Sequence, residues 1–153
     1  MAKLQTAQKS YGVCIGKQLA VADLTGSPSV FTITGGPIAV RQLGFMVTTL
    51  MAGANNLKFQ HTVTGGSAAD LCGNVDTDAG AVGQLYVIDG VKVTAATKVT
   101  DPGIAVYADI DHMPIILSTG TITAVFDSTS TAGAGVVFME YTPLSQFTNV
   151  SIA

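Results

Sequence analysis

The sequence predicts an all-β protein that folds as one jelly-roll-like β-sandwich with an extended N-terminal arm. Three observations predict this class. β-Branched residues are abundant, glycine occurs 17 times in 153 residues, and no window holds a long helical period. Turn signals separate the apolar segments at intervals of about 8–12 residues, which is typical of sandwiches and barrels rather than of a parallel α/β sheet.

Each expected strand is an apolar or alternating segment bounded by turn residues. Segment 28–34 alternates and ends at the turn signal Gly35-Gly36-Pro37, and segment 57–64 places Leu57, Phe59, His61 and Val63 on one side. The expected strands, in order, are 28–34, 38–53 (one or two buried strands), 57–64, 84–90, 92–100, 104–110, 114–120, 121–127 and 135–144.

Two hairpins and three regions follow from these segments. We expect 84–90 to pair with 92–100 across the dipeptide Asp89-Gly90, a favoured hairpin turn. We expect 121–127 to pair with 135–144, joined by the small residues from Ser128 to Gly135. Segment 67–80 is expected to be irregular, with at most one helical turn. The predicted organisation is an N-terminal arm (1–10), a sandwich domain (11–145) and a C-terminal tail (146–153).

Composition narrows the classes of partner. Charged residues make up 11% of the chain, against about 25% in an ordinary globular protein, so an assembly contact is expected to cover part of the surface. The net charge is −3 and the seven basic residues are scattered, which argues against nucleic-acid binding. No apolar run reaches the roughly 20 residues of a membrane-spanning helix. The first residues contain no apolar signal region, so we expect synthesis in the cytoplasm.

Two cysteines and one histidine are expected to be structural. Cys14 and Cys72 lie among apolar or small residues, where free cysteine behaves as a small buried hydrophobe; a disulfide or a reactive thiol is the alternative. His61 lies on the apolar side of its strand, which favours a hydrogen-bonded core or interface histidine over a catalytic one.

Two acidic clusters are the candidates for metal chemistry. Asn74, Asp76 and Asp78 have the spacing that opens a calcium loop, but Ala79 and Leu85 stand where that loop needs Gly and Glu. We therefore interpret this cluster as a polar turn whose carboxylates bind their own backbone.

The second cluster, Asp109, Asp111 and His112, is interpreted as a solvated strand end rather than a ligand set. No phosphate loop, nucleophile elbow or zinc motif occurs, and Glu140 is the only glutamate. We predict no catalytic residue, no metal site and no cofactor, and thus not an enzyme.

The second expected hairpin is the candidate for a subunit contact. Both of its strands carry a largely apolar face and a second, partly apolar face, a pattern typical of the middle of a sandwich or of an interface. The predicted subunit-contact residues are Phe126, Val137, Phe138, Met139 and Tyr141.

Three stretches resemble small structural proteins of tailed bacteriophages: ITGGPIAVRQLGFMVTTLMAGANNLKF, ADLCGNVDTDAGAVGQLYVIDG and ILSTGTITAVFDSTSTAGAGVVFMEYTPLS. The similarity consists of the GGP strand entry, the long apolar segment after it, and a closing strand pair that ends in YTPL. It spans residues 28–145. It implies a capsid decoration (cement) protein with a jelly-roll-like core, which binds the major capsid protein on the outer surface of the virion as a homotrimer.

Two other functions stay open at this stage. A phage fibre, spike or receptor-binding module predicts exposed aromatic side chains on loop tips, and only 7% of the residues are aromatic. A metal-binding protein or metal-dependent enzyme would use Asp76, Asp78, Asp109 and Asp111.

Overall fold

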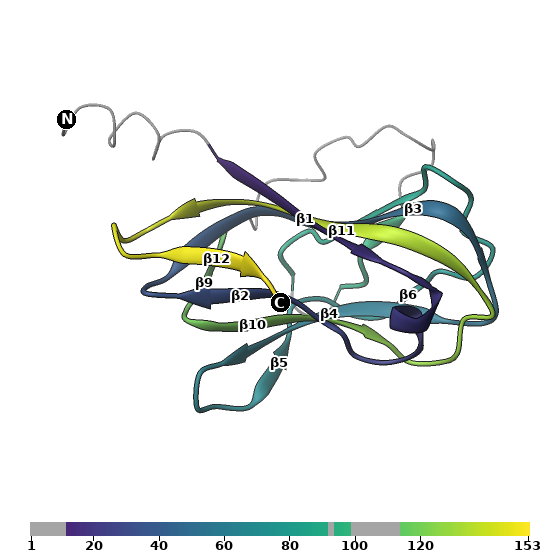
Figure 1. Ribbon diagram of the computed structural model, residues 1–153, viewed down its shortest axis with the longest axis horizontal. Coiled ribbons are helices and arrows are strands. Elements are labelled where there is room, and N and C mark those ends of the chain that lie inside the picture. The colour runs from purple at the N-terminus through teal and green to yellow at the C-terminus, as the bar shows by residue number, and fades with distance from the viewer. Residues whose placement is uncertain (1–11, 92–93, 99–113) are drawn as a thin grey trace.

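The protein is an all-β sandwich of two antiparallel sheets (Figure 1). The computed structural model describes residues 12–91, 94–98 and 114–153. The predicted fold class is confirmed. The predicted N-terminal arm and the strand expected at 104–110 lie outside the described residues.

Within the described residues each sheet has six strands, and one short 3₁₀ helix, η1 (Val21–Thr25), joins the sheets after β1. Sheet A has the order β1, β11, β3, β7, β8, and β9 also pairs with β3. Its strands are β1 (Val13–Leu19), β3 (Ile38–Ala52), β7 (Leu85–Val87), β8 (Thr97–Lys98), β9 (Ile115–Leu117) and β11 (Ala132–Pro143). Sheet B has the order β12, β2, β10, β4, β5, and β6 also pairs with β4. Its strands are β2 (Ser29–Thr34), β4 (Asn56–Val63), β5 (Ala68–Asp70), β6 (Val75–Asp76), β10 (Gly120–Phe126) and β12 (Asn149–Ile152).

The core lies between the two sheets and is built by the alternation seen in the sequence. The rings of Phe45 on β3 and Phe126 on β10 meet edge to face across the sheets, with centroids 5.9 Å apart. Phe45 also stacks on Tyr86 of β7 at 6.4 Å. Aromatic pairs of this kind add about 0.5–1.5 kcal/mol beyond the area that they bury. They therefore help to fix how the sheets face each other.

The hairpin expected between 121–127 and 135–144 is wrong. β10 pairs with β2 and β4 in sheet B, whereas β11 pairs with β1 and β3 in sheet A. The connection 127–131 crosses from one sheet to the other, a distance of about 10 Å. The apolar faces of β10 and β11 therefore lie opposite each other in the core instead of side by side in one sheet.

Two local expectations also need correction. β7 and β8 do pair, as expected, but Val87 is opposite Thr97, so Asp89-Gly90 is not the hairpin turn. Segment 67–80 contains no helical turn; it forms β5 and β6 along the edge of β4. The Asp89 carboxylate accepts a hydrogen bond from the Val91 amide at 2.8 Å, a local turn that the dipeptide pattern does not distinguish from a hairpin.

The segment expected to be a C-terminal tail belongs to the sandwich. β12 pairs with β2 along its whole length and forms one edge of sheet B. The Lys17 ammonium of β1 donates to the main-chain oxygens of Ser29 and Ala153, both at 2.7 Å. Lys17 thus ties the outer edges of the two sheets together on this side of the molecule.

Candidate interaction surfaces

Of the five predicted subunit-contact residues, four lie in the core of the chain itself. Phe126, Val137, Met139 and Tyr141 are between 0% and 6% exposed and point into the space between the sheets. Phe138 alternates with them and lies on the outer face of sheet A. Of the five, only Phe138 is placed where a neighbouring subunit could reach it.

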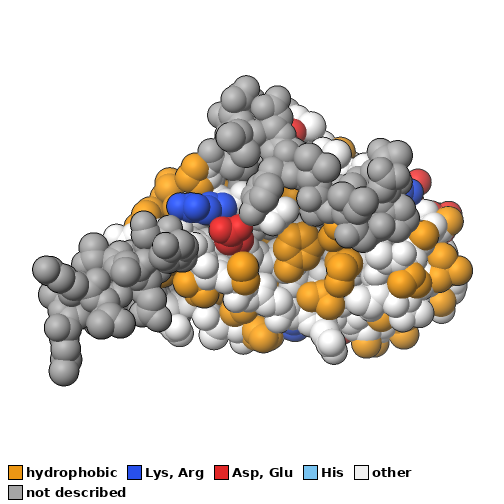
Figure 2. Space-filling model, turned by 90° about the horizontal axis from the view of Figure 1, so that it is seen from above, with side chains coloured by type: hydrophobic (Ala, Val, Ile, Leu, Met, Phe, Trp, Pro, Cys, Tyr) orange, Lys and Arg blue, Asp and Glu red, His pale blue; other side chains and the backbone are white. Residues whose placement is uncertain are grey.

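The Phe138 ring lies across Gly44 of β3. A Cβ at Gly44 would come within 2.7 Å of both the Phe138 ring and the Tyr86 carbonyl oxygen, so only glycine leaves room for the ring. Val136 and Met46 are cross-strand partners on the same face. Figure 2 looks onto this face and shows hydrophobic side chains gathered there, with a few charged ones beside them.

The outer face of sheet B has a different character. Thr121 is the cross-strand partner of Thr32 on one side and of Thr62 on the other, and Ser151 partners Thr32 at the sheet edge. Cross-strand partners share a face and lie about 4.7–4.9 Å apart. We call these four residues the hydroxyl row. It presents small, uncharged side chains across neighbouring strands, and such side chains lose little conformational entropy in a contact.

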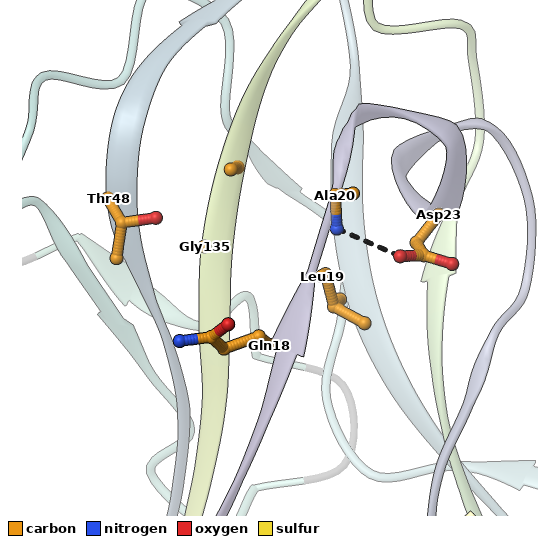
Figure 3. A pocket seen from close by; sticks show the side chains of 7 residues that line it. Gln18, Leu19, Ala20, Asp23, Thr48 and Gly135 are labelled. Carbon is orange, nitrogen blue, oxygen red and sulfur yellow. Dashed lines mark hydrogen bonds between the residues drawn. The ribbon is translucent and has the colours of Figure 1, made fainter.

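A shallow depression of about 350 Å³ lies between β1, β11 and β3 (Figure 3). It forms where the small residues Ala134 and Gly135 of β11 run between Gln18 on β1 and Thr48 on β3. Asp23 is the charged residue of its lining, and its carboxylate already accepts a hydrogen bond from the Ala20 amide at 2.8 Å. Apart from Asp23, the polar side chains of the lining are the Gln18 amide and the Thr48 hydroxyl. These groups suit the binding of a partner's side chain better than catalysis.

The first acidic cluster is a polar turn, as expected. Asp76 Oδ1 accepts a hydrogen bond from the Asp78 amide, and Asp78 Oδ1 accepts one from the Ala79 amide, both at 2.9 Å. In residues 12–91, 94–98 and 114–153, no three His, Cys, Asp or Glu side chains gather closely enough to hold a metal ion. The second cluster, Asp109, Asp111 and His112, lies outside the described residues.

His61 is a buried, hydrogen-bonded histidine, as expected. Its Nε2 donates to the Ser118 carbonyl oxygen at 3.1 Å. Burial lowers the pKa of His61, and this hydrogen bond opposes the shift. Burial therefore favours the neutral imidazole over the charged one.

The cysteines differ from each other. Cys72 is fully buried, and burial raises the pKa of its thiol; its Sγ accepts a hydrogen bond from the Phe59 amide at 3.4 Å. Cys14 is exposed on β1, so the expectation that both are buried is wrong for Cys14. Its neighbours in the sequence are apolar or small, but side chains of a strand alternate between its two faces. In the edge strand β1, Cys14 lies on the outward face, next to Glu140 of β11. Both cysteines are free thiols.

The two ends of the sandwich differ in charge. At the end on the left of Figure 1, the turns are 35–37, 64–67, 118–119 and 144–148, and these segments contain no charged residue. We call this the neutral end. The opposite end consists of η1 and segments 53–55, 76–84 and 127–131. Those segments contain four aspartates (Asp23, Asp76, Asp78 and Asp127) and no lysine or arginine. We call it the acidic end.

The acidic end is held together by the side chain of Asn55, which lies between β3 and β4. Asn55 is 2% exposed. Its Nδ2 donates to the Leu24 carbonyl and to Ser130 Oγ, both at 2.8 Å, and its Oδ1 accepts from the Ser128 amide at 3.2 Å. Its main-chain oxygen accepts from the Thr77 amide and hydroxyl at 2.9 and 3.0 Å. One side chain thus joins η1 to the crossing between β10 and β11.

Next to this network, Asp127 joins the start of β4 to the segment after β10 at the surface of the same end. Its two oxygens accept hydrogen bonds from the Asn56 side chain at 2.8 Å and from the Asn56 amide at 2.9 Å. These bonds hold the pKa of Asp127 below its ordinary value. Asn55 and Asn56 therefore have different roles, one fully buried and one half-buried, although they look alike in the sequence.

The sequence pattern did not mark the apolar residues of the neutral end as a surface: Leu144 ends the expected strand 135–144, Ile116 lies within the expected strand 114–120, and Phe147 falls in the expected C-terminal tail. Phe147 is 73% exposed, Ile116 59% and Leu144 49%. Exposed apolar side chains that cluster often mark an interaction site. In the part of the chain that is described, no helix has the length and apolar character needed to cross a bilayer.

Comparisons with known proteins identify no relative. No family model, no curated protein and no solved structure matches this chain.

Proposed function

We propose that this protein is a structural virion protein, a capsid decoration (cement) protein that binds the outer surface of the major capsid shell as a homotrimer and stabilises it. The resemblance of residues 28–145 to tailed-phage structural proteins suggests the class. The observation that carries the proposal is the hydroxyl row, which lines up Thr62, Thr121, Thr32 and Ser151 across four neighbouring strands on the outer face of sheet B.

A protein that fastens a shell needs contact area on a rigid scaffold. A specific, stable interface buries about 1,200–2,000 Å² in total. The hydroxyl row offers short side chains on a hydrogen-bonded sheet, so little entropy is lost when it is covered. Repeated copies on a shell, each weakly bound, would add their effects through multivalency.

The test is binding to purified shells. The protein is expected to sediment with shells of its source particle and to saturate at a number of copies comparable to that of the major coat protein. Thr121→Arg places a long, charged side chain in the middle of the hydroxyl row and is expected to weaken this binding at least tenfold. Thr129→Arg adds the same charge at the acidic end and is the matched control. No sedimentation of the wild-type protein, and none of it in purified particles, would contradict the proposal.

A second candidate function is a fibre, spike or receptor-binding module. The number of copies per particle distinguishes it from a decoration protein. The observation that favours it is Phe147, an exposed aromatic side chain on a turn at the neutral end. A module of that kind is expected at a few copies per particle, at a vertex or on the tail. A decoration protein is expected at many copies over the shell.

A further inference from the structure

Three large apolar side chains at the neutral end are exposed to solvent. Phe147 and Leu144 belong to the turn 144–148, and Ile116 belongs to β9. Ile116 and Thr142 partner the same β3 residue, Ala39, from opposite sides. Ile116 therefore lies on sheet A close to the point where β11 leads into this turn.

The turn that carries Leu144 and Phe147 is firmly held. The Leu144 amide and the Thr148 hydroxyl both donate to the Pro37 carbonyl, at 3.0 and 3.2 Å. The Phe147 amide donates to Ser145 Oγ at 3.2 Å, and the Thr148 amide donates to the Ser145 carbonyl at 3.2 Å. A surface that is already ordered loses less entropy on binding.

The composition around these side chains matches the anatomy of an interface. Its centre is apolar and includes an aromatic residue, the type most often found at binding hot spots. The neighbouring residues Ser145, Gln146 and Thr148 are polar and uncharged, as in the rim of a protein contact.

Charge indicates what the partner is. In a symmetric homo-oligomer, identical parts of the copies converge near the axis. At the acidic end, convergence would bring the aspartates of different copies together, and like charges at close range are unfavourable. At the neutral end no described turn segment carries a charge, so these segments of different copies can converge without repulsion between them. A membrane surface is a poorer fit, since interfacial binding combines apolar residues with Lys or Arg, which these segments lack.

We propose that copies of this chain meet through the neutral end, with the exposed apolar side chains Phe147, Leu144 and Ile116 in the contact. This rests on the homotrimer of the proposed function and places its subunit contact. It assigns the contact to residues other than Phe126, Val137, Met139 and Tyr141, which fill the core.

The experiment measures the mass of the full chain by sedimentation velocity over a range of concentrations. The wild-type protein is expected to associate, and Phe147→Ser and Leu144→Ser are each expected to raise the dissociation constant at least tenfold. Val82→Ser is the matched control: Val82 is 59% exposed at the acidic end, and its loss is expected to leave association unchanged. Melting temperatures of all variants should match the wild type, because the replaced side chains project into solvent.

Each other outcome overturns the proposal in a distinct way. Association that survives Phe147→Ser and Leu144→Ser but fails in Phe138→Ser would move the contact to the outer face of sheet A and leave the trimer intact. A wild-type chain that stays monomeric would remove the trimer itself, while shell sedimentation would still test decoration. A monomer that binds neutral phosphatidylcholine vesicles through Phe147 would identify a lipid surface as the partner instead.

Discussion

The two ends of this sandwich are built on different principles. The acidic end is joined from inside, because the buried Asn55 side chain bonds to η1 and to the crossing segment between the sheets. The neutral end is fixed by turn hydrogen bonds to Pro37 and leaves Phe147 and Leu144 in solvent. The comparison teaches that a buried side chain joins the acidic end, whereas the neutral end is joined by hydrogen bonds of its turns and carries an exposed aromatic side chain.

The largest effect is expected from breaking the acidic end. Asn55→Ala removes three side-chain hydrogen bonds and leaves buried groups without partners, so the free energy of unfolding should fall by about 2–4 kcal/mol. Urea unfolding followed by circular dichroism measures this, with an unchanged slope against denaturant as the sign of an intact two-state transition.

Asn56→Ala is the matched control for that variant. Asn56 bonds to Asp127 at the surface, and its loss should cost less than about 1 kcal/mol. Equal losses for the two asparagines would mean that the buried network does not hold this end together.

A smaller effect is expected from a clash at the neutral end. Gly35 and Gly65 both have a φ of +74°, which side chains rarely adopt. A Cβ at Gly35 would overlap the Phe147 carbonyl oxygen, whereas a Cβ at Gly65 has nothing within 4 Å. Gly65→Ala should lower the free energy of unfolding by about 1 kcal/mol, through backbone strain alone. Gly35→Ala should lower it by about 2–3 kcal/mol, because the turn 144–148 must also move.

Gly35→Ala and Gly65→Ala also test whether the turn 144–148 lies in the proposed subunit contact. In sedimentation velocity, Gly35→Ala should weaken association because it displaces Phe147, while Gly65→Ala should not. If the two variants lose the same stability and associate equally, the turn 144–148 adapts freely and is not the preorganised surface described above.

The smallest effect concerns a buried hydroxyl that faces the acidic end. Tyr86 Oη is buried and has no hydrogen-bond partner among the described residues. Burial, followed by the charge of Asp76, raises the pKa of Tyr86 from 10.0 to about 12. Tyr86→Phe should therefore raise the free energy of unfolding at pH 7 by about 1 kcal/mol.

The change of stability at alkaline pH also tests the Tyr86 hydroxyl, and its direction can be predicted. Between pH 10 and pH 12 the unfolded chain loses the Tyr86 proton while the native chain keeps it, so ionisation favours the unfolded state and stability falls as pH rises. Tyr86→Phe should remove that part of the decline. Tyr141→Phe is the comparison, because burial raises the pKa of Tyr141 as well. A decline that is unchanged in Tyr86→Phe would place the pH dependence elsewhere.

Most strands could be predicted because their cause is local, whereas β1, β5, β6 and β12 were not. In 28–34, 57–64 and 121–127 the apolar side chains alternate, and a pleated strand turns alternate residues to opposite faces. The buried position of His61 followed from this phase, and the polar turn at Asp76 and Asp78 followed from carboxylates spaced to reach their own backbone.

The pairing of strands could not be predicted, because it depends on contacts between residues far apart in the chain. The same alternation in 121–127 and 135–144 is compatible with a hairpin or with two strands that face each other across a core. For the same reason the pattern could not tell an apolar core face from an interface, and it assigned Phe126, Val137, Met139 and Tyr141 to a subunit contact. Neither the buried role of Asn55 nor the exposure of Phe147 has a local signature.

The sequence by itself determined an all-β chain with little charge, the position of most strands and the absence of charge from the turns of one end. Only the tertiary structure decided which strands share a sheet, which apolar face is core, and that four separate uncharged turns come together at one end. The physical reason is that alternation and turn chemistry act over a few residues, whereas sheet pairing and the sorting of charge to one end follow from packing the whole chain around one core.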